Sequence, residues 1–223
     1  MIESHLACTV RGCGLPLERS ERAWACRAGH GYDVSRSGYV NLLQPQDRRS
    51  PVAGDSSEAI DARARLLAAG VGRTILDRFV AQAAGLDLPD RALVVELGSG
   101  AGEALGALAL RREITGVGID LSAAAASRAA RRFPALTWVV ANADRRLPLV
   151  DRSASLVLSM HARRNPAESA RVLSPHGHLL LGVPAADDLI ELRAAVMGRG
   201  GGLRSPRTAA AEGRVGPKCH SVP

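Results

Sequence analysis

One motif restricts the possible folds most strongly: a short apolar run that contains an acidic residue and is followed by a glycine-rich turn. The run is Val94-Val95-Glu96-Leu97, and the turn is Gly98-Ser99-Gly100-Ala101-Gly102. Closely spaced glycines after a buried strand are typical of a turn into a helix whose N-terminus approaches a ligand, because glycine lacks a Cβ. The motif therefore predicts an α/β protein with a ligand site at the carboxyl end of this strand.

Apolar runs alternate with helical stretches along the chain from Ala92 onward. We expect strands at 93–97, 115–119, 136–140, 154–159 and 177–183, and helices at 57–69, 71–84 and 165–173, with Ala-rich helices after the first two strands. This alternation predicts a parallel sheet with helices on both faces. In the second helix, Ile75, Phe79 and Val80 are expected on one apolar face.

Acidic residues lie at or after the ends of three successive strands, at Glu96, Asp120 and Asp144. A carboxylate after the second strand can accept hydrogen bonds from ribose hydroxyls, and one after the third can meet an adenine amino group. Each acid alone could simply cap a helix. Dinucleotide enzymes use G-x-G-x-x-G, and the tighter spacing here favours S-adenosylmethionine (SAM). The expected cofactor-binding residues are Glu96, Gly98, Gly100, Gly102, Glu103, Asp120 and Asp144.

A cluster of potential metal ligands lies near the N-terminus. Cys8, Cys13, Cys26 and His30 have the spacing C-x4-C-x12-C-x3-H. Structural zinc sites use four such ligands, and clustered cysteines in a cytosolic chain favour metal over disulfides. A unit of about 40 residues rarely builds a sufficient core, so zinc would supply stability. The other interpretation is three unrelated thiols and a loop histidine; Cys219 is interpreted as a free thiol.

With both patterns in view, the chain resembles the bacterial 23S rRNA (guanine-N1)-methyltransferases, which include the tylosin- and mycinamicin-resistance enzymes. The resemblance covers residues 8 to about 195. It is carried by the two motifs and Asp120 together with 26–30, 32–34, 38–43, 54–56, 62–64, 67–70, 164–168 and 171–173. It implies a Rossmann-like SAM-dependent methyltransferase sheet with a small N-terminal zinc-binding module that helps to select the RNA. The implied partner is a hairpin of 23S ribosomal RNA.

Several positions depart from the family pattern. The first cysteine pair is four residues apart instead of two. Gly72 replaces a tyrosine that borders SAM, and Asp188 replaces a histidine of the same site, so both positions belong to the expected cofactor site. Family members also continue past residue 195. The sheet is therefore expected to lack its last two strands, which would leave 177–183 as an exposed apolar edge of a truncated enzyme.

These features divide the chain into four segments: a zinc-binding RNA-recognition module at 1–43, a linker at 44–58, the methyltransferase domain at 59–197 and a disordered basic tail at 198–223. The net charge is +7, but the tail holds five basic residues and one acid, so charge alone is weak evidence for nucleic-acid binding. No apolar run approaches the ~20 residues of a membrane span, and no signal peptide is recognisable. A cytoplasmic location without membrane contact is expected.

The loop after the fourth predicted strand, 159–165, should face the methyl group of the cofactor. His161 could act as a base, Arg164 could hold a phosphate or the guanine carbonyl, and Asn165 could orient the base. Surface positions without a catalytic role are the competing interpretation. Two other functions stay open: a catalytically impaired RNA-binding relative, and a small-molecule methyltransferase. Dimerisation and macrolide resistance also stay open.

Overall fold

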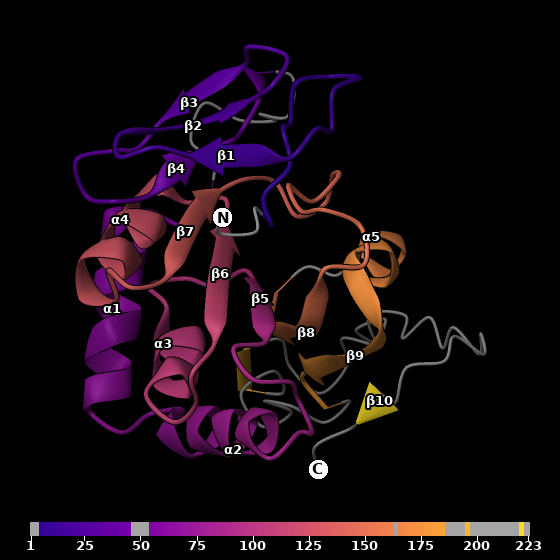
Figure 1. Ribbon diagram of the computed structural model, residues 1–223. Coiled ribbons are helices and arrows are strands. Elements are labelled where there is room, and N and C mark those ends of the chain that lie inside the picture. The colour runs from indigo at the N-terminus through magenta and orange to yellow at the C-terminus, as the bar shows by residue number, and fades with distance from the viewer. Residues whose placement is uncertain (1–4, 46–53, 163–164, 186–194, 197–218, 221–223) are drawn as a thin grey trace.

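The N-terminal part of the molecule is a small antiparallel sheet. The computed structural model describes residues 5–45, 54–162, 165–185, 195–196 and 219–220. The small sheet has the order β1-β2-β3, with β1 at Leu17–Arg19, β2 at Ala23–Cys26 and β3 at Gly31–Asp33. It lies at the top of Figure 1, beyond the ends of β6 and β7 of a larger sheet.

Among the described residues, the larger sheet has seven strands in the order β10-β9-β8-β5-β6-β7-β4, and their pairings are parallel. Its strands are β4 (Val40–Asn41), β5 (Leu93–Leu97), β6 (Thr115–Asp120), β7 (Thr137–Val140), β8 (Ala154–Met160), β9 (Leu173–Gly182) and β10 (Cys219–His220). Both β6 and β8 flank β5, so the strand order reverses there, and ligands of open α/β sheets bind beyond such a point. The predicted α/β fold class is confirmed.

Helices connect these strands. In the described part of the chain they are α1 (Ser57–Ala68), α2 (Arg73–Ala84), α3 (Glu103–Ala109), α4 (Ala123–Arg132) and α5 (Pro166–Val172). The side chain of Ser56 caps α1, and that of Ser122 caps α4. None of the helices in the described ranges is long and apolar enough to cross a bilayer.

The predicted buried face of α2 needs one correction. Phe79 and Val80 are buried as expected, but Ile75 is 58% exposed. The helix begins at Arg73, after the left-handed Gly72, and its apolar stripe runs through Leu76, Phe79, Val80 and Ala83. Ile75 lies one residue outside this i, i+3, i+4, i+7 pattern and therefore faces solvent.

The two faces of the large sheet are covered by different structures. On one face, Val94 belongs to a core that includes buried residues of α2, α3 and α4. On the opposite face, Val95 belongs to a core with Val172 of α5 and with residues of the N-terminal part, Leu6, Leu17, Trp24 and Leu42. The expectation of helices on both faces is therefore only partly right. The N-terminal module covers much of the second face and shares one hydrophobic core with the sheet.

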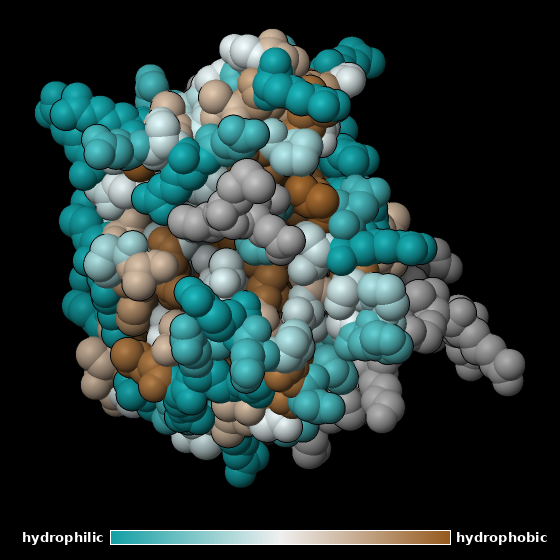
Figure 2. All heavy atoms as spheres, viewed as in Figure 1, coloured by the Kyte–Doolittle hydropathy of each residue, from teal (hydrophilic) through white to brown (hydrophobic). Residues whose placement is uncertain are grey.

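The outer surface is mostly polar on the side shown in Figure 1. Hydrophilic side chains predominate there, and hydrophobic ones form small separate areas between them (Figure 2). Large apolar side chains that are exposed on or beside α1, α2 and α3 include Leu66, Val71, Ile75 and Leu110. Single apolar side chains of this kind are normal on protein surfaces, so they do not by themselves indicate a binding site.

Two short strands of the large sheet were not predicted. Val40–Asn41, expected to belong to the zinc module alone, forms β4 and pairs with β7. Cys219–His220, expected in a disordered tail, forms β10 and pairs with β9 opposite Leu179 and Leu180. The expected apolar edge at 177–183 is thus not bare, and the predicted end of the sheet at this strand is corrected. Two-residue strands carry no periodic signal, so only long-range pairing identifies them. The remaining tail, 197–218 and 221–223, lies outside the described residues.

Candidate functional site

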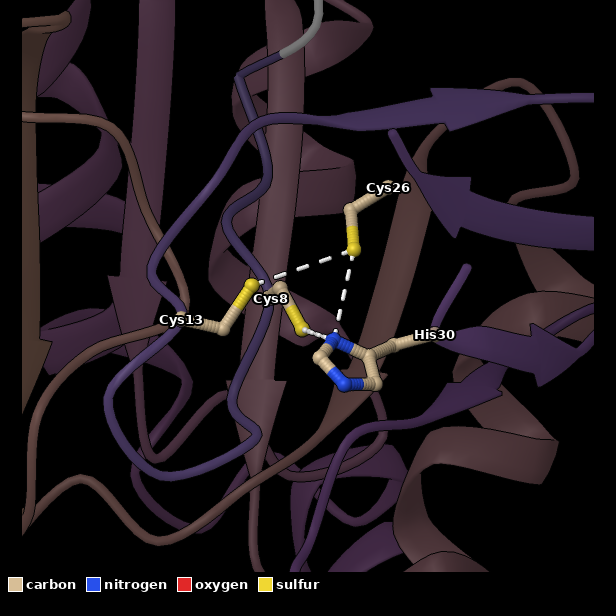
Figure 3. Close-up of side chains that lie close together, drawn as sticks. All are labelled: Cys8, Cys13, Cys26 and His30. Atoms are coloured by element: carbon tan, nitrogen blue, oxygen red, sulfur yellow. Dashed lines mark hydrogen bonds between the residues drawn. The ribbon is translucent and has the colours of Figure 1, made fainter. Parts of the chain in front are cut away.

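Four predicted metal ligands converge in the N-terminal module (Figure 3). Cys8 and Cys13 lie on one loop, Cys26 ends β2, and His30 directly precedes β3. One ligand atom from each residue lies within 4.8 Å of all the others. The Sγ atoms of Cys13 and Cys26 are 3.8 Å apart, and Nδ1 of His30 lies 3.5 Å from Sγ of Cys8 and 3.4 Å from Sγ of Cys26.

These separations fit a tetrahedral zinc ion. With Zn–S bonds of about 2.3 Å and Zn–N bonds of about 2.1 Å, ideal tetrahedral ligands are roughly 3.7 Å apart for two sulfurs and roughly 3.6 Å for sulfur and nitrogen. The four side chains therefore suit a structural Cys3His zinc site. The predicted ligand set is brought together as one cluster.

The loops around the cluster favour metal binding. Gly29 has a φ of 83°, and its N–H donates to the carbonyl of Cys26, which turns the chain back toward His30. Burial raises the pKa of the Cys26 thiol, but hydrogen bonds with the backbone of His30 and Ala28 outweigh it and lower that pKa to about 7. The thiolate that zinc requires is therefore accessible near neutral pH.

Tyr32, which belongs to the family resemblance but was not predicted as a site residue, contacts the cluster. The hydroxyl oxygen of Tyr32 lies 3.1 Å from Sγ of Cys8 and accepts a hydrogen bond of 3.1 Å from the backbone N–H of Thr9. Such hydrogen bonds around a metal ligand orient it. Tyrosine is no part of the Cys/His spacing, so only the fold reveals the contact of Tyr32 with the cluster.

The second site is a cavity of about 430 Å³ at the carboxyl ends of β5, β6, β7 and β8. This size lies within the usual range of small-molecule sites. Its lining includes six residues predicted for the cofactor and one predicted for catalysis: Glu96, Gly98, Gly100, Glu103, Asp120, Asp144 and His161.

Asp120 holds the glycine-rich turn against β6. Its Oδ2 accepts a 2.8 Å hydrogen bond from the N–H of Gly100, and its Oδ1 accepts one of 2.8 Å from the N–H of Ser122. Burial raises the pKa of Asp120. A Cβ at Gly98 would lie 2.4 Å from Cβ of Ala162, so this position requires glycine on steric grounds as well as for its φ of 68°.

Glu96 lies at the back of the cavity and is 3% exposed. Its Oε2 accepts a 3.0 Å hydrogen bond from the N–H of Leu105, in the first turn of α3. Burial raises the pKa of this carboxyl group to about 8. The carboxyl thus links the end of β5 to the helix that follows the turn.

A buried serine in the turn indicates a polar ligand. Ser99 is 3% exposed and lines the cavity, and its hydroxyl has no hydrogen-bond partner among the described residues. Buried hydroxyl groups usually have a partner, so this one fits a site whose ligand supplies it. Together with the acids at three strand ends, it matches the polar groups of SAM.

Two residues predicted for the cofactor do not line this cavity. A Cβ at Gly102 would lie 2.4 Å from Cη2 of Trp138, so Gly102 allows close packing of the turn on the core. Gly72 precedes α2, and a Cβ there would lie 3.9 Å from the side chain of Leu67. Asp188, also predicted for this site, lies outside the described residues.

Of the described residues predicted for catalysis, His161 lies at the cavity and Asn165 supports the neighbouring loop. His161 is exposed, lines the cavity and has a φ of 57°, and its backbone N–H donates to the carbonyl of Gly182. Asn165 instead caps α5, and its amide donates to the carbonyl of Arg145 at 3.1 Å. Its side chain thereby ties α5 to the loop after β7. Arg164 lies outside the described residues.

Part of the expected linker lines the cavity too. Gly54 and Asp55 approach the start of α4, where the Ser122 hydroxyl donates to the carbonyl of Asp55 at 2.7 Å. Arg63 of α1 also lines the cavity. Residues 54–56 and 62–64 belong to the family resemblance, and this resemblance could have identified Gly54, Asp55 and Arg63 as residues of the site. Their distance in sequence from the glycine-rich turn hid the contact.

Comparisons with known protein families divide the chain in the same way as its two sites. Residues 7–51 match the family model described as "RlmA, N-terminal", a zinc ribbon. Residues 94–177 match the model described as "Methyltransferase domain".

Similar proteins match most of the chain. The 23S rRNA (guanine(748)-N(1))-methyltransferase of Streptomyces fradiae is 39% identical over 184 residues, which are 81% of this chain and 64% of that protein. A protein of Micromonospora griseorubida assigned to the 23S rRNA (guanine-N(1)-)-methyltransferases is 39% identical over 210 residues, 84% of this chain and 68% of that protein. The chain thus spans about two thirds of the length of these relatives.

Proposed function

Since the chain belongs to the family of 23S rRNA (guanine-N1)-methyltransferases, we propose that it transfers a methyl group from SAM to N1 of a guanine in 23S ribosomal RNA. The carrying observation is that one chain matches a zinc-ribbon model over the zinc cluster and a methyltransferase model over most of the acid-lined cavity, and that its 39% identity to these relatives covers 81–84% of its length. A module for RNA selection and a cofactor site are thus retained together. Ribosomal RNA as substrate also implies a cytoplasmic location.

The cavity residues would divide the recognition of SAM among them. The Oδ2 of Asp120 accepts from Gly100 of the turn and its Oδ1 accepts from Ser122 at the start of α4, and each oxygen has a second acceptor site. We assign those sites to the ribose hydroxyls and assign Asp144, after the third strand of the motif, to the adenine amino group. Bound SAM would supply an electrophilic methyl group, and Glu96 and Glu103 line the cavity that would hold the cofactor.

The guanine must reach the cavity with its Watson–Crick edge free. N1 lies on that edge, so the nucleotide has to be unpaired or turned out of its helix. N1 also carries a proton that must leave when the methyl group is transferred. We assign His161 to receive this proton, because it lies at the exposed rim of the cavity and an imidazole nitrogen can accept a proton. Asn165 would position the neighbouring loop, and Arg164 would contact a phosphate or the guanine carbonyl.

The test is methylation of unmodified 23S rRNA by the purified, zinc-loaded protein with SAM. N1 methylation blocks base pairing, so primer extension should stop one nucleotide before the modified guanine. The name of the Streptomyces fradiae relative makes guanine 748 the first position to inspect. No SAM-dependent stop, from protein shown to bind both zinc and SAM, contradicts the proposal.

Matched variants separate cofactor binding from proton transfer. Asp120→Ala should abolish the stop and weaken SAM binding in calorimetry, whereas Asp90→Ala should change neither, because Asp90 is an exposed residue before β5 and outside the cavity. His161→Ala should lower kcat by about 100-fold, the scale of general base catalysis, with SAM affinity retained. Unchanged kcat would remove His161 from the mechanism.

A further inference from the structure

A second cavity lies between the loop of the first two zinc ligands and the loop after β7. It has a volume of about 680 Å³, and we call it the junction groove. The groove is lined by the loop of the first two zinc ligands, by Leu42 and Leu43 after β4, and by residues 141, 142 and 145–148 after β7. Ala141 and Asn142 line both this groove and the cofactor cavity, so the two spaces share a wall.

The groove has a positive lining. Arg11, Arg145 and Arg146 are exposed and line it, and no acidic residue is among the described lining residues. Arg11 comes from the zinc module, whereas the other two come from the loop after β7. Three arginines thus line one space from both of its sides. Such a lining favours an anion.

Arg146 can exchange its ion-pair partner for another anion with little loss of folding stability. Its ion pair with Asp151 is 3.5 Å long, and both side chains are 60% exposed. Exposed pairs of this kind contribute little to stability. Asp151 also has a second partner, Arg171, whose side chain is only 14% exposed. A phosphate could therefore replace Asp151 at Arg146 without leaving that carboxylate unpaired.

The zinc cluster determines where Arg11 lies. Arg11 belongs to the four-residue loop between Cys8 and Cys13, and ligands at both ends of the loop attach it to the metal site. Gly12 and Gly14 flank Cys13 with φ angles of 81° and 67°, which glycine adopts without strain. A Cβ at Gly14 would lie 4.0 Å from the guanidinium of Arg146, so the two sides of the groove meet there.

We propose that the junction groove binds phosphates of the RNA strand that carries the target guanosine, with Arg11, Arg145 and Arg146 as the phosphate contacts. The proposal rests on the function proposed above. A base that enters the cofactor cavity must bring its own backbone past the rim, and the shared wall at Ala141 and Asn142 makes the groove the adjoining channel. Arginine binds phosphate through several parallel hydrogen bonds. Zinc thus positions one of the three contacts.

The test measures the salt dependence of RNA binding. A fluorescent 23S rRNA hairpin is titrated with the zinc-loaded protein over a range of KCl concentrations, and anisotropy gives the affinity. For single strands, each phosphate contact adds about 0.7 to the slope of log affinity against log salt. The triple variant R11A/R145A/R146A should therefore lose about 2 from this slope, and roughly 100-fold in affinity at about 0.1 M salt.

A matched control removes the same charge elsewhere. In R73A/R91A/R111A, three exposed arginines outside both cavities are lost, and the slope should stay within about 0.7 of the wild-type value. Arg11→Lys should retain most of the slope that Arg11→Ala loses. SAM affinity and zinc content should match the wild type in every variant, while KM for RNA rises in the triple variant alone.

The outcomes keep the two proposals apart. An unchanged slope and RNA KM in R11A/R145A/R146A overturn the junction groove, even if the wild type methylates RNA. Equal losses in the triple variant and its control also overturn it, because general charge would then explain the binding. A wild type that binds the hairpin through these arginines but makes no SAM-dependent primer-extension stop supports the groove and contradicts the proposed methylation.

Discussion

Loss of a zinc ligand should destabilise the whole chain and not the N-terminal module alone. Leu6, Leu17, Trp24 and Leu42 of the N-terminal part are each at most 9% exposed and belong to the same core as the sheet. Exposing four such side chains costs roughly 6–12 kcal/mol at about 1.5–3 kcal/mol each. Since whole domains are stable by only about 5–15 kcal/mol, the module cannot detach and leave a folded sheet. We expect Cys26→Ala to lower the midpoint temperature of unfolding and to leave a single transition.

The two tryptophans allow a direct assay. Trp24 lies in the core shared with the module, and Trp138 lies in the core on the helical side of the sheet. Variants with Trp24→Phe or Trp138→Phe each report one side by fluorescence during thermal unfolding, with zinc and with a chelator. Both fluorescence signals should report the same midpoint temperature of unfolding. Removal of zinc should lower both midpoint temperatures by the same amount.

A pair of leucines provides the control. Leu17→Ala should lower the same transition, with a cost of about 3–5 kcal/mol, because Leu17 is fully buried in the core that module and sheet share. Leu110→Ala should leave it unchanged, because Leu110 is 83% exposed. If the chelator shifts the Trp24 signal while the Trp138 transition keeps its midpoint, the reasoning from a shared core is refuted.

Two further predictions concern the cofactor cavity. The pKa of Glu96 is about 8 when folded and near 4.5 when unfolded, so the folded state holds the extra proton and stability should fall as pH rises between these values. Glu96→Gln should flatten that slope in pH-dependent thermal unfolding; an unchanged slope would assign it to other groups. Gly102→Ala should cost about 1–3 kcal/mol by urea unfolding, because its methyl group would meet Trp138 at 2.4 Å. Wild-type stability in this variant would contradict the packing role.

Local signals in the sequence were sufficient for the main elements. The five longer strands and the helices at 57–69 and 165–173 were predicted within a few residues, because alternating apolar runs and capping residues act over short distances. The zinc ligands were predicted from spacing alone, since the paired residues lie on tight turns. Acids at strand ends likewise placed Glu96 and Asp120 at one edge of the sheet.

Roles that depend on distant contacts were not accessible in this way. Asn165 was predicted to face the substrate, but its amide bonds the loop after β7, twenty residues earlier in the chain. Gly102 accommodates Trp138, a contact that the motif does not indicate, and its approach to the cofactor stays a prediction. Arg63 and Asp55 line the cavity from segments interpreted as a helix and a linker. Each outcome depends on which neighbour the folded chain brings into contact.

The sequence by itself thus determined the α/β class, the zinc ligands and the glycine-rich turn, because each depends on residues close together in the chain. Only the tertiary structure decided that the N-terminal module covers one face of the sheet, that Val40–Asn41 and Cys219–His220 extend it, and that Arg11 and Arg146 line one groove from opposite sides. These arrangements depend on burial and pairing between segments far apart in sequence. No local periodicity records them.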